Sequence, residues 1–447
     1  MRPDKLHTLR IDGVGASGEG VGRLEGRAVF VPAAIPGERW QIRLAHCRGR
    51  RLEAEPVRLL DRSPDRVEPV CPVFGRCGGC QLMHMAYPAQ LELKQAVLAD
   101  SLRSVAGIEL EAAVPIEPAA APLGYRNRGQ YPVGRQAGRV VTGFFAPRSH
   151  DLVPVESCAL HAEGVDRAVR QVRAWAGKER ISIYDERAHR GWLRHVVARS
   201  ANGELMVVLV GRAERRLAWR DLLRRLRRAL PGLVGLVINI NPRRTNVVIG
   251  PRMRVLWGRP FVVEHLLGLR FRLTVGSFFQ VHTAQAERLF EKLRRFAGRP
   301  AGPVVDAFCG VGVLAQILAA DGHELVGIES AAVAVRDARE SLRDNGLRGV
   351  RIVQSRVETA LPRLVSSGLR PALVVLDPPR KGCHPAVLEA VARSGAQRVA
   401  YVSCHPGTLA RDLARLAELG YRRVRFEAVD MFPQTAHLEC FVGLERA

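Results

Sequence analysis

The sequence predicts a multidomain α/β protein with a small N-terminal β-barrel, a central α+β domain and a C-terminal doubly wound parallel sheet. Three observations lead to this prediction. Glycine-rich turns separate short β-like runs at the N-terminus, three cysteines follow within a short stretch, and strand-like and helix-like segments alternate regularly from about residue 269. The length of 447 residues suits about three domains of roughly 150 residues each. We place them at 1–62, 63–268 and 269–447.

The charge balance points to a polyanionic partner. The chain has 68 Lys and Arg residues against 44 Asp and Glu residues, which gives a formal net charge of +24. A basic excess of this size binds polyanions through phosphate contacts and the release of counterions. Nucleic acid is therefore the expected partner.

Composition also bears on location. Hydrophobic residues make up 47% of the chain, as in globular proteins, but no apolar run reaches the ~18 residues of a membrane span. The N-terminus, Met1–Lys5, lacks the apolar stretch of a signal peptide. The 9 cysteines, an odd number, argue against a disulfide framework. We expect a cytoplasmic monomer with no membrane partner, whose cysteines serve metal binding and catalysis.

The first domain is expected to be a small barrel. Short β-like runs such as Ala28–Val31 and Trp40–Leu44 are separated by glycine-rich turns, including residues 13–20. The later part carries a group of arginines: Arg43, Arg48, Arg50 and Arg51. Barrels of this size that carry arginines commonly follow a nucleic-acid backbone, so we expect this domain to contact RNA or DNA.

The second domain opens with a cysteine-rich stretch. Cys71, Cys77 and Cys80 place three soft thiolates on a glycine-containing loop that can fold closely around a metal ion or cluster. Cys158 is the nearest downstream candidate for a fourth ligand, and Cys47 is its competitor. Zinc and iron–sulfur clusters both accept four thiolates, but the spacing departs from the usual zinc knuckle, so we favour a [4Fe-4S] cluster.

The rest of the second domain predicts helices and further basic surface. Apolar spacing indicates an amphipathic helix near 89–106, a candidate for packing on the third domain, and a basic helix at 215–230. We expect the arginines of the basic helix to form a solvated face, with RNA contact as the second interpretation. Aromatic residues and arginines are mixed at 125–128 and 191–195, as contacts to unpaired bases require.

In the third domain, a strand, a glycine turn and a helix follow one another at 303–320. Gly310 and Gly312 let a ligand approach the backbone at a helix N-terminus. The next strand ends in Glu329, an acidic residue at a place that suits a ribose diol. The third glycine of the dinucleotide fingerprint is missing. This favours S-adenosylmethionine (SAM), which has no phosphate to cradle, over a pyrophosphate cofactor.

Reactive side chains are predicted at four successive strand ends: Asp306, Glu329, Asp377 and Cys404. In an open parallel sheet, ligands bind in the crevice beyond the carboxyl ends of the strands, so we expect these residues to share one site. Glu439 stands just before the last apolar run. A thiol and a carboxylate in one crevice can act as nucleophile and general base, and we assign these roles to Cys404 and Glu439.

Five ordered motifs resemble those of the RNA (uracil-5-)-methyltransferase family. They are Phe278–Val281, Asp306–Gly312, Asp377–Arg380, Tyr401–Pro406 and Asp430–Glu439. The N-terminal barrel resembles the TRAM domain of that family, and the cysteine-rich stretch resembles the [4Fe-4S] site of its ribosomal-RNA branch. The resemblance covers essentially the whole chain.

This resemblance implies SAM-dependent methylation of uracil C5 in RNA, with 23S ribosomal RNA as the expected substrate. It implies a C-terminal Rossmann-like methyltransferase domain in which Cys404 adds to the base and Glu439 removes a proton. The residues expected to contact SAM are Gln280, Phe308, Gly310, Glu329 and Asp377. The implied ligands of the [4Fe-4S] cluster are Cys71, Cys77, Cys80 and Cys158.

The chain departs from the family pattern at four positions. His405 follows the nucleophile and His282 follows the Phe-x-Gln-x motif, where the family often has asparagine. Val313 replaces an asparagine that contacts the cofactor, and Ser355 stands where a polar or acidic residue usually meets the adenine. These departures affect the substrate assignment more than the reaction class.

Three other functions share part of this pattern. A tRNA (uracil-5-)-methyltransferase would have the same catalytic residues, and some of these enzymes carry both a barrel and a cysteine site. A non-catalytic RNA-binding iron–sulfur protein would keep the barrel and the cysteines but would not need Cys404 with Glu439. An amino-group methyltransferase could use Asp377–Arg380 but would require no nucleophilic cysteine.

Overall fold

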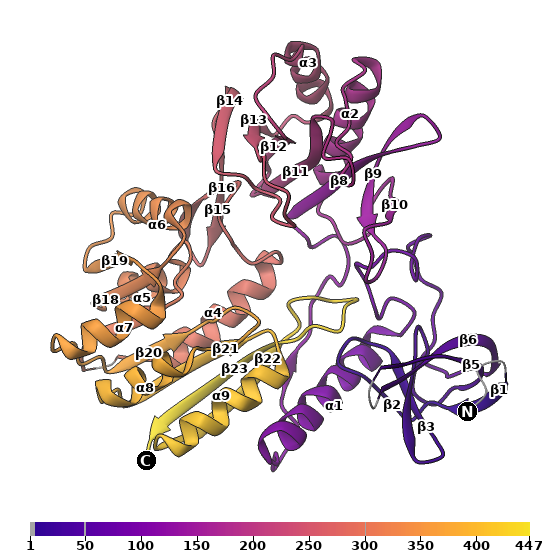
Figure 1. Cartoon of the computed structure of the whole chain (residues 1–447). Coiled ribbons are helices and arrows are strands. Elements are labelled where there is room, and N and C mark those ends of the chain that lie inside the picture. Colours follow the sequence, from indigo (N-terminus) through magenta and orange to yellow (C-terminus); the bar gives the residue numbers. More distant parts are fainter. Residues whose placement is uncertain (1–4, 49–50, 300) are drawn as a thin grey trace.

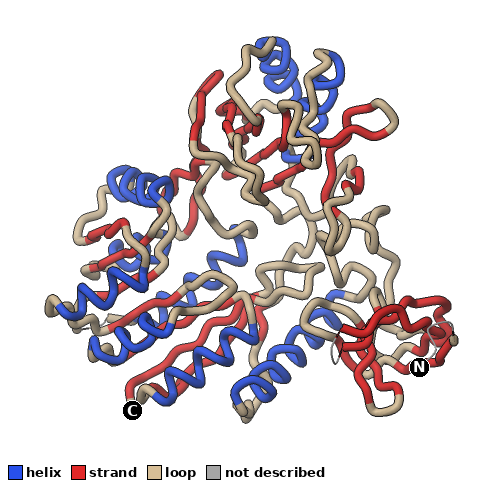
Figure 2. The backbone as a smooth tube through the Cα atoms, viewed as in Figure 1, coloured by secondary structure: helices blue, strands red, loops and turns tan. Residues whose placement is uncertain are grey.

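The structure is a computed structural model that describes residues 5–48, 51–299 and 301–447, and the strands of these residues form four sheets (Figure 1). Arg50 lies outside the described residues, as do the side chains of Cys47 and Arg48. Figure 2 shows the strands gathered in an N-terminal, a central and a C-terminal group, with helices against the latter two. Within the described ranges, every helix is too short or too polar to cross a membrane.

The N-terminal sheet curls into a small barrel. Its strand order is β1-β5-β6-β4-β3-β2. Leu9, Val29 and Ile42 are among the buried residues of its core. β3 passes close to β1, and a Cβ on Gly22 would lie 2.1 Å from the carbonyl oxygen of Arg10, so only glycine fits there. The strands are β1 (Leu6–Arg10), β2 (Gly13–Val14), β3 (Gly20–Leu24), β4 (Arg27–Val31), β5 (Arg39–Arg48) and β6 (Arg51–Asp61).

The middle strands of the central sheet are buried on both faces. Leu205, Val207 and Leu209 pack under α2 and α3, whereas Met206 and Val208 face the hairpin β15–β16 and the C-terminal core. Successive strand residues point to opposite faces, which is why this run is apolar throughout. In order, the sheet contains β10 (Leu152–Pro154), β9 (Arg139–Phe145), β8 (Arg128–Gln136), β11 (Leu193–Ala201), β12 (Glu204–Gly211), β13 (Leu233–Ile240) and β14 (Arg252–Gly258). The helices and hairpin are α2 (Val165–Lys178), α3 (Trp219–Ala229), β15 (Phe261–Leu266) and β16 (Leu269–Thr274).

The C-terminal sheet has eight strands in the order β19-β18-β17-β20-β21-β23-β22-β7. The first five are parallel, and β23 runs antiparallel to both of its neighbours. Its strands are β7 (Ile116–Glu117), β17 (Val304–Ala307), β18 (Leu325–Glu329), β19 (Val350–Gln354), β20 (Leu373–Leu376), β21 (Arg398–Ser403), β22 (Tyr421–Val429) and β23 (Glu439–Arg446).

Helices cover both faces of the C-terminal sheet. One face packs against α4 and α5, and the other against α7, α8 and α9. This doubly wound arrangement explains why alternate residues of each strand, such as Val304 and Val305, belong to different cores. The helices are α4 (Thr283–Ala297), α5 (Val313–Ala320), α6 (Ala332–Asp344), α7 (Val357–Ser366), α8 (Pro385–Ser394) and α9 (Pro406–Glu418).

Helix α1 (Tyr87–Ala106) joins this C-terminal layer although it precedes the central sheet in the sequence. Its buried Leu98 and Leu102 belong to the same apolar cluster as Leu409 and Leu413 of α9. Figure 1 shows α1 alongside α9, near the strands β22 and β23. The helix that follows the cysteine-rich stretch is thereby held against α9 of the C-terminal layer.

Candidate active site

The sheet order brings the reactive strand-end residues to one edge of the C-terminal sheet. β18, β17, β20 and β21 lie side by side, and Glu329, Asp306, Asp377 and Cys404 lie at or just after their carboxyl ends. Because β23 runs antiparallel to β21, its first residue, Glu439, lies at the same edge. A thiol and four carboxyl groups therefore share one edge of the sheet.

Cys404 and Glu439 face each other across two neighbouring strands. Ser403 of β21 pairs with Cys440 of β23. In an antiparallel ladder, the next residue of one strand lies opposite the preceding residue of the other, so Cys404 is placed opposite Glu439. The two side chains also interact electrostatically.

Burial dominates the protonation of these groups. It raises the pKa of Cys404 to about 11, with a further contribution from Glu439, whereas the Arg380 guanidinium opposes that rise. Burial also raises the pKa of Asp377 to about 7 and that of Asp306 to about 8. The pKa of Glu439 is raised by its burial and by the nearby Asp377. A cationic ligand at this edge would favour the ionised form of each group.

A cavity at this edge is lined by four of the residues expected to contact SAM: Gln280, Phe308, Gly310 and Asp377. The Oε1 atom of Gln280 is buried and has no hydrogen-bond partner among the described residues. A buried acceptor without a donor is costly, and a ligand that brings an N–H or O–H group would remove this cost. The cavity therefore fits a polar, donor-bearing ligand, which SAM is.

Glu329 lies beside this cavity rather than in its lining. Its carboxylate accepts hydrogen bonds from the main-chain N–H groups of Gly310 at 3.1 Å and Ala331 at 2.6 Å. Each carboxylate oxygen has a second lone pair, so the side chain can still accept a ribose hydroxyl. The space next to Gly310 is open, since a Cβ there would meet no atom within 4 Å.

The turn between β17 and α5 is strained at Phe308. Its φ is 72°, in the left-handed region that residues other than glycine rarely adopt. Strain of this kind costs about 1–3 kcal/mol and concentrates at ligand sites. No sequence pattern reveals it, because the conformation is imposed by the turn that places Phe308 in the cavity lining.

Two of the four departures from the family pattern are helix caps. Nδ1 of His282 accepts from the main-chain N–H of Gln285 at 3.4 Å, at the start of α4. Nδ1 of His405 accepts from the main-chain N–H of Thr408 at 3.3 Å, at the start of α9. Asparagine is among the most favoured N-cap residues and makes the same kind of bond. The change from asparagine to histidine thus preserves the cap.

Four cysteines line a second cavity, of about 420 Å³: Cys71, Cys77, Cys80 and Cys158. All four are free thiols. Burial raises the pKa of Cys80 to about 12 and that of Cys158 to about 11, and neighbouring thiols add to both shifts. Within the described ranges, no three Cys, His, Asp or Glu side chains are arranged to hold a single metal ion. Four thiols around one cavity are a donor set that fits a polynuclear iron–sulfur cluster.

The two cavities are neighbours, because Phe278 and Phe279 line both of them. Phe278 is 62% exposed, which is unusual for a large apolar side chain. Arg126 and Arg128 line the cavity on the cysteine side. An exposed aromatic ring can stack on an unpaired base, and arginines beside it can contact the phosphate of that nucleotide.

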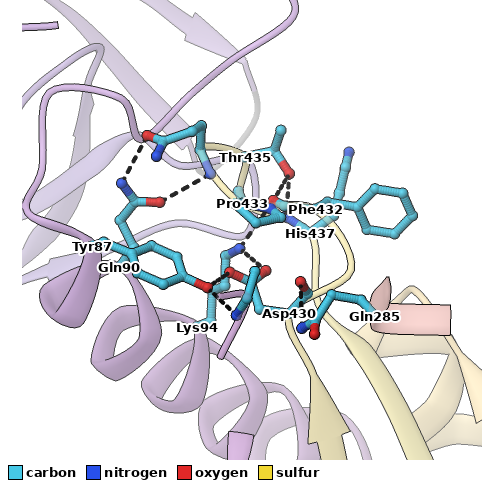
Figure 3. A network of polar contacts seen from close by, with 12 residues as sticks. Tyr87, Gln90, Lys94, Gln285, Asp430, Phe432, Pro433, Thr435 and His437 are labelled. Atoms are coloured by element: carbon cyan, nitrogen blue, oxygen red, sulfur yellow. Dashed lines mark hydrogen bonds and ion pairs between the residues drawn. The ribbon is translucent and has the colours of Figure 1, made fainter. Parts of the chain in front are cut away.

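The loop that leads into Glu439, residues 430–438, is held by α1 (Figure 3). We call it the base loop, after the general-base role that the sequence predicts for Glu439. Nζ of Lys94 lies 2.6 Å from Oδ1 of Asp430, and neither side chain is exposed to solvent. The Tyr87 hydroxyl donates to the other carboxylate oxygen of Asp430 at 2.9 Å. This network joins segments 336 residues apart in the sequence, and no local pattern predicts it.

We expect Lys94→Met to destabilise the protein strongly. The substitution keeps most of the packing volume but leaves the buried Asp430 carboxylate without its cation, which typically costs about 3–5 kcal/mol. Urea unfolding measures the free energy of unfolding. The matched control is Lys178→Met, which breaks the solvent-exposed pair between Lys178 and Asp221 and should leave the free energy of unfolding close to that of the wild type. Equal losses in the two variants would contradict the prediction.

Comparison with known protein families decides the class of protein. A family model described as tRNA (uracil-5-)-methyltransferase matches residues 86–447, and a TRAM domain model matches residues 7–57. The chain belongs to the tRNA (uracil-5-)-methyltransferase family. The N-terminal barrel of the methyltransferase is its TRAM domain, and its C-terminal sheet has the fold of SAM-dependent methyltransferases. The resemblance predicted from the five sequence motifs is confirmed.

Similar proteins align with the methyltransferase over nearly its whole length. It is 36% identical to an uncharacterized RNA methyltransferase of Clostridium tetani, over 99% of this chain and 96% of the relative. It is 40% identical to another from Gloeobacter violaceus, over 98% of this chain and 96% of the relative. A solved structure of Pyrococcus abyssi tRNA (uracil-54, C5)-methyltransferase with S-adenosyl-L-homocysteine matches with a TM-score of 0.79 at 27% identity, over 98% of this chain and 99% of that one.

Proposed function

We propose that the methyltransferase modifies uracil C5 in RNA through a transient covalent bond between Cys404 and C6 of the base. The observation that carries this proposal is the register of β21 and β23, which places Cys404 opposite Glu439. Both residues lie at the sheet edge that also carries the cavity lined by Gln280 and Asp377. The reaction requires three parts: a nucleophile, a general base and a pocket for the methyl donor.

The nucleophile is needed because uracil C5 is a poor nucleophile by itself. The Cys404 thiolate forms a bond to C6, and the electron pair of the C5=C6 double bond moves to C5 and onto the C4 carbonyl oxygen. C5 can then attack an electrophilic methyl group, which SAM supplies when bound. Burial raises the pKa of the free thiol, and Arg380 favours the thiolate that the addition requires.

Glu439 completes the reaction by accepting the proton from C5. The electron pair of the C5–H bond re-forms the C5=C6 double bond, and the C6–S bond breaks with its pair returning to sulfur as thiolate. Burial and the nearby Asp377 raise the pKa of Glu439, so its carboxylate is a stronger base than an exposed one. The raised pKa of Glu439 and its position opposite Cys404, which would hold the uracil ring, suit this proton transfer.

We assign SAM binding to Gln280, Phe308, Gly310, Glu329 and Asp377. The unpaired Oε1 atom of Gln280 and the open space beside Gly310 support this assignment. The match to a structure that contains S-adenosyl-L-homocysteine supports it as well. Isothermal titration with SAM tests it, because Asp377→Asn should weaken binding and the remote Asp61→Asn should not.

We also assign a [4Fe-4S] cluster to Cys71, Cys77, Cys80 and Cys158. These residues would each supply one thiolate, and the cluster would hold the surrounding loop in shape without taking part in methyl transfer. Protein purified without oxygen should contain ~4 iron and ~4 sulfide ions per chain and absorb broadly in the visible range. Cys80→Ser should lose most of this absorbance, whereas Cys383→Ser should keep it. Zinc in place of iron would contradict the assignment.

Ribosomal RNA, 23S in particular, is our first candidate substrate, because a TRAM barrel and four clustered cysteines occur together in this chain. tRNA is the second candidate, since the Pyrococcus abyssi enzyme whose structure matches 98% of this chain is a tRNA (uracil-54, C5)-methyltransferase. In either RNA the target uridine must be unstacked, because Cys404 cannot reach C6 inside a duplex.

The experiment that tests the proposed function uses labelled SAM and unmodified RNA. Ribosomal RNA and tRNA transcripts are incubated with the protein, digested and analysed as nucleosides. 5-Methyluridine in ribosomal RNA alone supports the first candidate, and in tRNA alone the second. Methylation at a base nitrogen, or none in either RNA, would overturn the assignment to uracil C5.

A further inference from the structure

One residue of the base loop has a backbone conformation that its side chain does not favour. Gln434 has a φ of 69°, in the left-handed region, and it is 7% exposed. A residue other than glycine keeps this conformation only when its surroundings enforce it. Gln434 lies five positions before Glu439, so the contacts that enforce this conformation also affect where Glu439 lies.

Gln90 of α1 bonds to Gln434 in both directions. The main-chain N–H of Gln434 donates to Oε1 of Gln90 at 3.0 Å, and Nε2 of Gln90 donates to Oε1 of Gln434 at 3.0 Å. Nε2 of Gln90 also donates to the carbonyl oxygen of Met85 at 2.8 Å, which fixes the orientation of the amide. Gln90 is 1% exposed, so water does not replace these bonds readily. Figure 3 shows the Gln90 side chain pointing from α1 into this network of contacts.

The carbonyl oxygen of Gln434 is bound from another part of the chain. The main-chain N–H groups of Gln81 and Leu82 both donate to it, at 3.1 and 3.0 Å. These two residues directly follow Cys80. The main-chain N–H of Gln434 is therefore hydrogen-bonded to α1, and its carbonyl oxygen is hydrogen-bonded to the loop that carries the cysteines.

The path from Gln434 to Glu439 is short, and half of its residues are buried. Thr435 and Leu438 are 3% and 1% exposed. The Thr435 hydroxyl accepts from the main-chain N–H of His437 at 3.3 Å, which makes this segment compact. A change of Gln434 to an ordinary conformation would therefore redirect the chain as it enters β23.

We propose that Gln90 is a positioning residue for the general base: it holds Gln434 in its left-handed conformation and thereby sets where Glu439 meets the C5 proton. This inference rests on the proposed function. Gln90 itself would not touch the RNA or SAM. Its influence would reach the reaction through the base loop.

This role predicts an effect on one step of the reaction. Addition of Cys404 and methyl transfer precede the proton abstraction and do not use Glu439. Loss of Gln90 should therefore slow only the last step and cause the covalent enzyme–RNA intermediate to accumulate. A residue that merely supports the fold would slow addition and turnover alike.

The test compares Gln90→Leu with Gln95→Leu. Gln95 lies on the same helix, and its side chain donates to the Val114 carbonyl at 3.1 Å rather than to a residue of the base loop. We expect Gln90→Leu to lower turnover on uridine RNA by roughly 10–100-fold, the scale of a small misplacement of a catalytic group. It should also accumulate enzyme–RNA complexes that survive denaturation. Gln95→Leu should match the wild type in both respects.

A second substrate isolates the earlier steps. In 5-fluorouridine RNA a fluorine replaces the C5 proton, so Glu439 has no proton to remove and the adduct is not released. The rate at which this adduct forms therefore reports addition and methyl transfer alone. Gln90→Leu should form this adduct at the wild-type rate within about twofold. If the variant loses adduct formation together with turnover, or if its turnover equals that of Gln95→Leu, the positioning role is wrong.

A rescue variant keeps the test valid if Gln90→Leu folds poorly. Glycine adopts a φ near 69° without strain, so Gln434→Gly should restore most of the turnover of Gln90→Leu. Failure of this rescue in a folded double variant would overturn the proposal. The proposed function fails separately: in that case the wild-type protein itself forms no adduct with 5-fluorouridine RNA.

Discussion

Cys404→Ala is expected to lose turnover by roughly 10⁴-fold or more, because the substitution removes the atom that adds to C6. The smaller side chain leaves the SAM cavity unchanged, since Cys404 is not among its lining residues. We therefore expect the dissociation constants for SAM and RNA to stay within about threefold of the wild type. The measurement is methyl transfer from labelled SAM into RNA, with binding measured separately by titration.

The control for this variant is Cys383→Ala. Cys383 is also buried in the C-terminal domain, but its side chain belongs to the apolar cluster that includes residues of α8 and α9, and it does not line the SAM cavity. This variant should lose stability through the small cavity it creates and keep most of its turnover. If Cys404→Ala retained turnover within tenfold of the wild type, the methyl group would reach the RNA without a covalent intermediate.

Glu439→Gln is expected to lower turnover by about 10²–10⁴-fold, the usual contribution of a general base. Glutamine has nearly the same shape as glutamate but does not accept the C5 proton. Addition and methyl transfer should continue, so the covalent complex with ordinary uridine RNA should accumulate. Gel electrophoresis under denaturing conditions detects this complex, and a time course of quenched samples gives its rate of decay.

Glu445→Gln provides the control, because Glu445 lies near the other end of β23 and forms an exposed ion pair with Arg422 at 3.6 Å. Its turnover should equal that of the wild type. If Glu439→Gln turned over within tenfold of the wild type, another group would have to accept the proton. If it accumulated no complex, Glu439 would act before methyl transfer, contrary to the proposed role.

The strand-end positions of the candidate site residues could be predicted from the sequence because each stands next to a recognisable strand. Asp377 and Cys404 directly follow apolar runs, and parallel strands bring such positions to one edge. The pairing of Cys404 with Glu439 could not be derived in this way. It depends on β23 lying beside β21 and running antiparallel, and a register is set by contacts between strands rather than within them.

The supports of the site were not predictable for the same reason. Lys94 and Asp430, like Gln90 and Gln434, meet across more than three hundred residues, and each looks like an ordinary polar residue in its own segment. The amphipathic pattern of α1 does predict a helix, but its buried side includes Gln90 and Lys94, which a pattern of apolar residues assigns to solvent.

Helix boundaries show a smaller difference. The basic helix expected at 215–230 begins at Trp219 in the structure. Its first turn has no side-chain cap, so the sequence contains no signal that marks the start. By contrast, α9 begins at Pro406 after the capping residue His405, where both the proline and the cap define its start.

The covalent role of Cys404 is tested most directly by mass spectrometry of the adduct with 5-fluorouridine RNA. The protein is incubated with SAM and this RNA, denatured and digested, and the peptide that carries the nucleotide is sequenced. The account predicts one modified peptide, attached through Cys404 and carrying one transferred methyl group on the base. Attachment through another cysteine, or a methylated RNA product without any adduct, would contradict it.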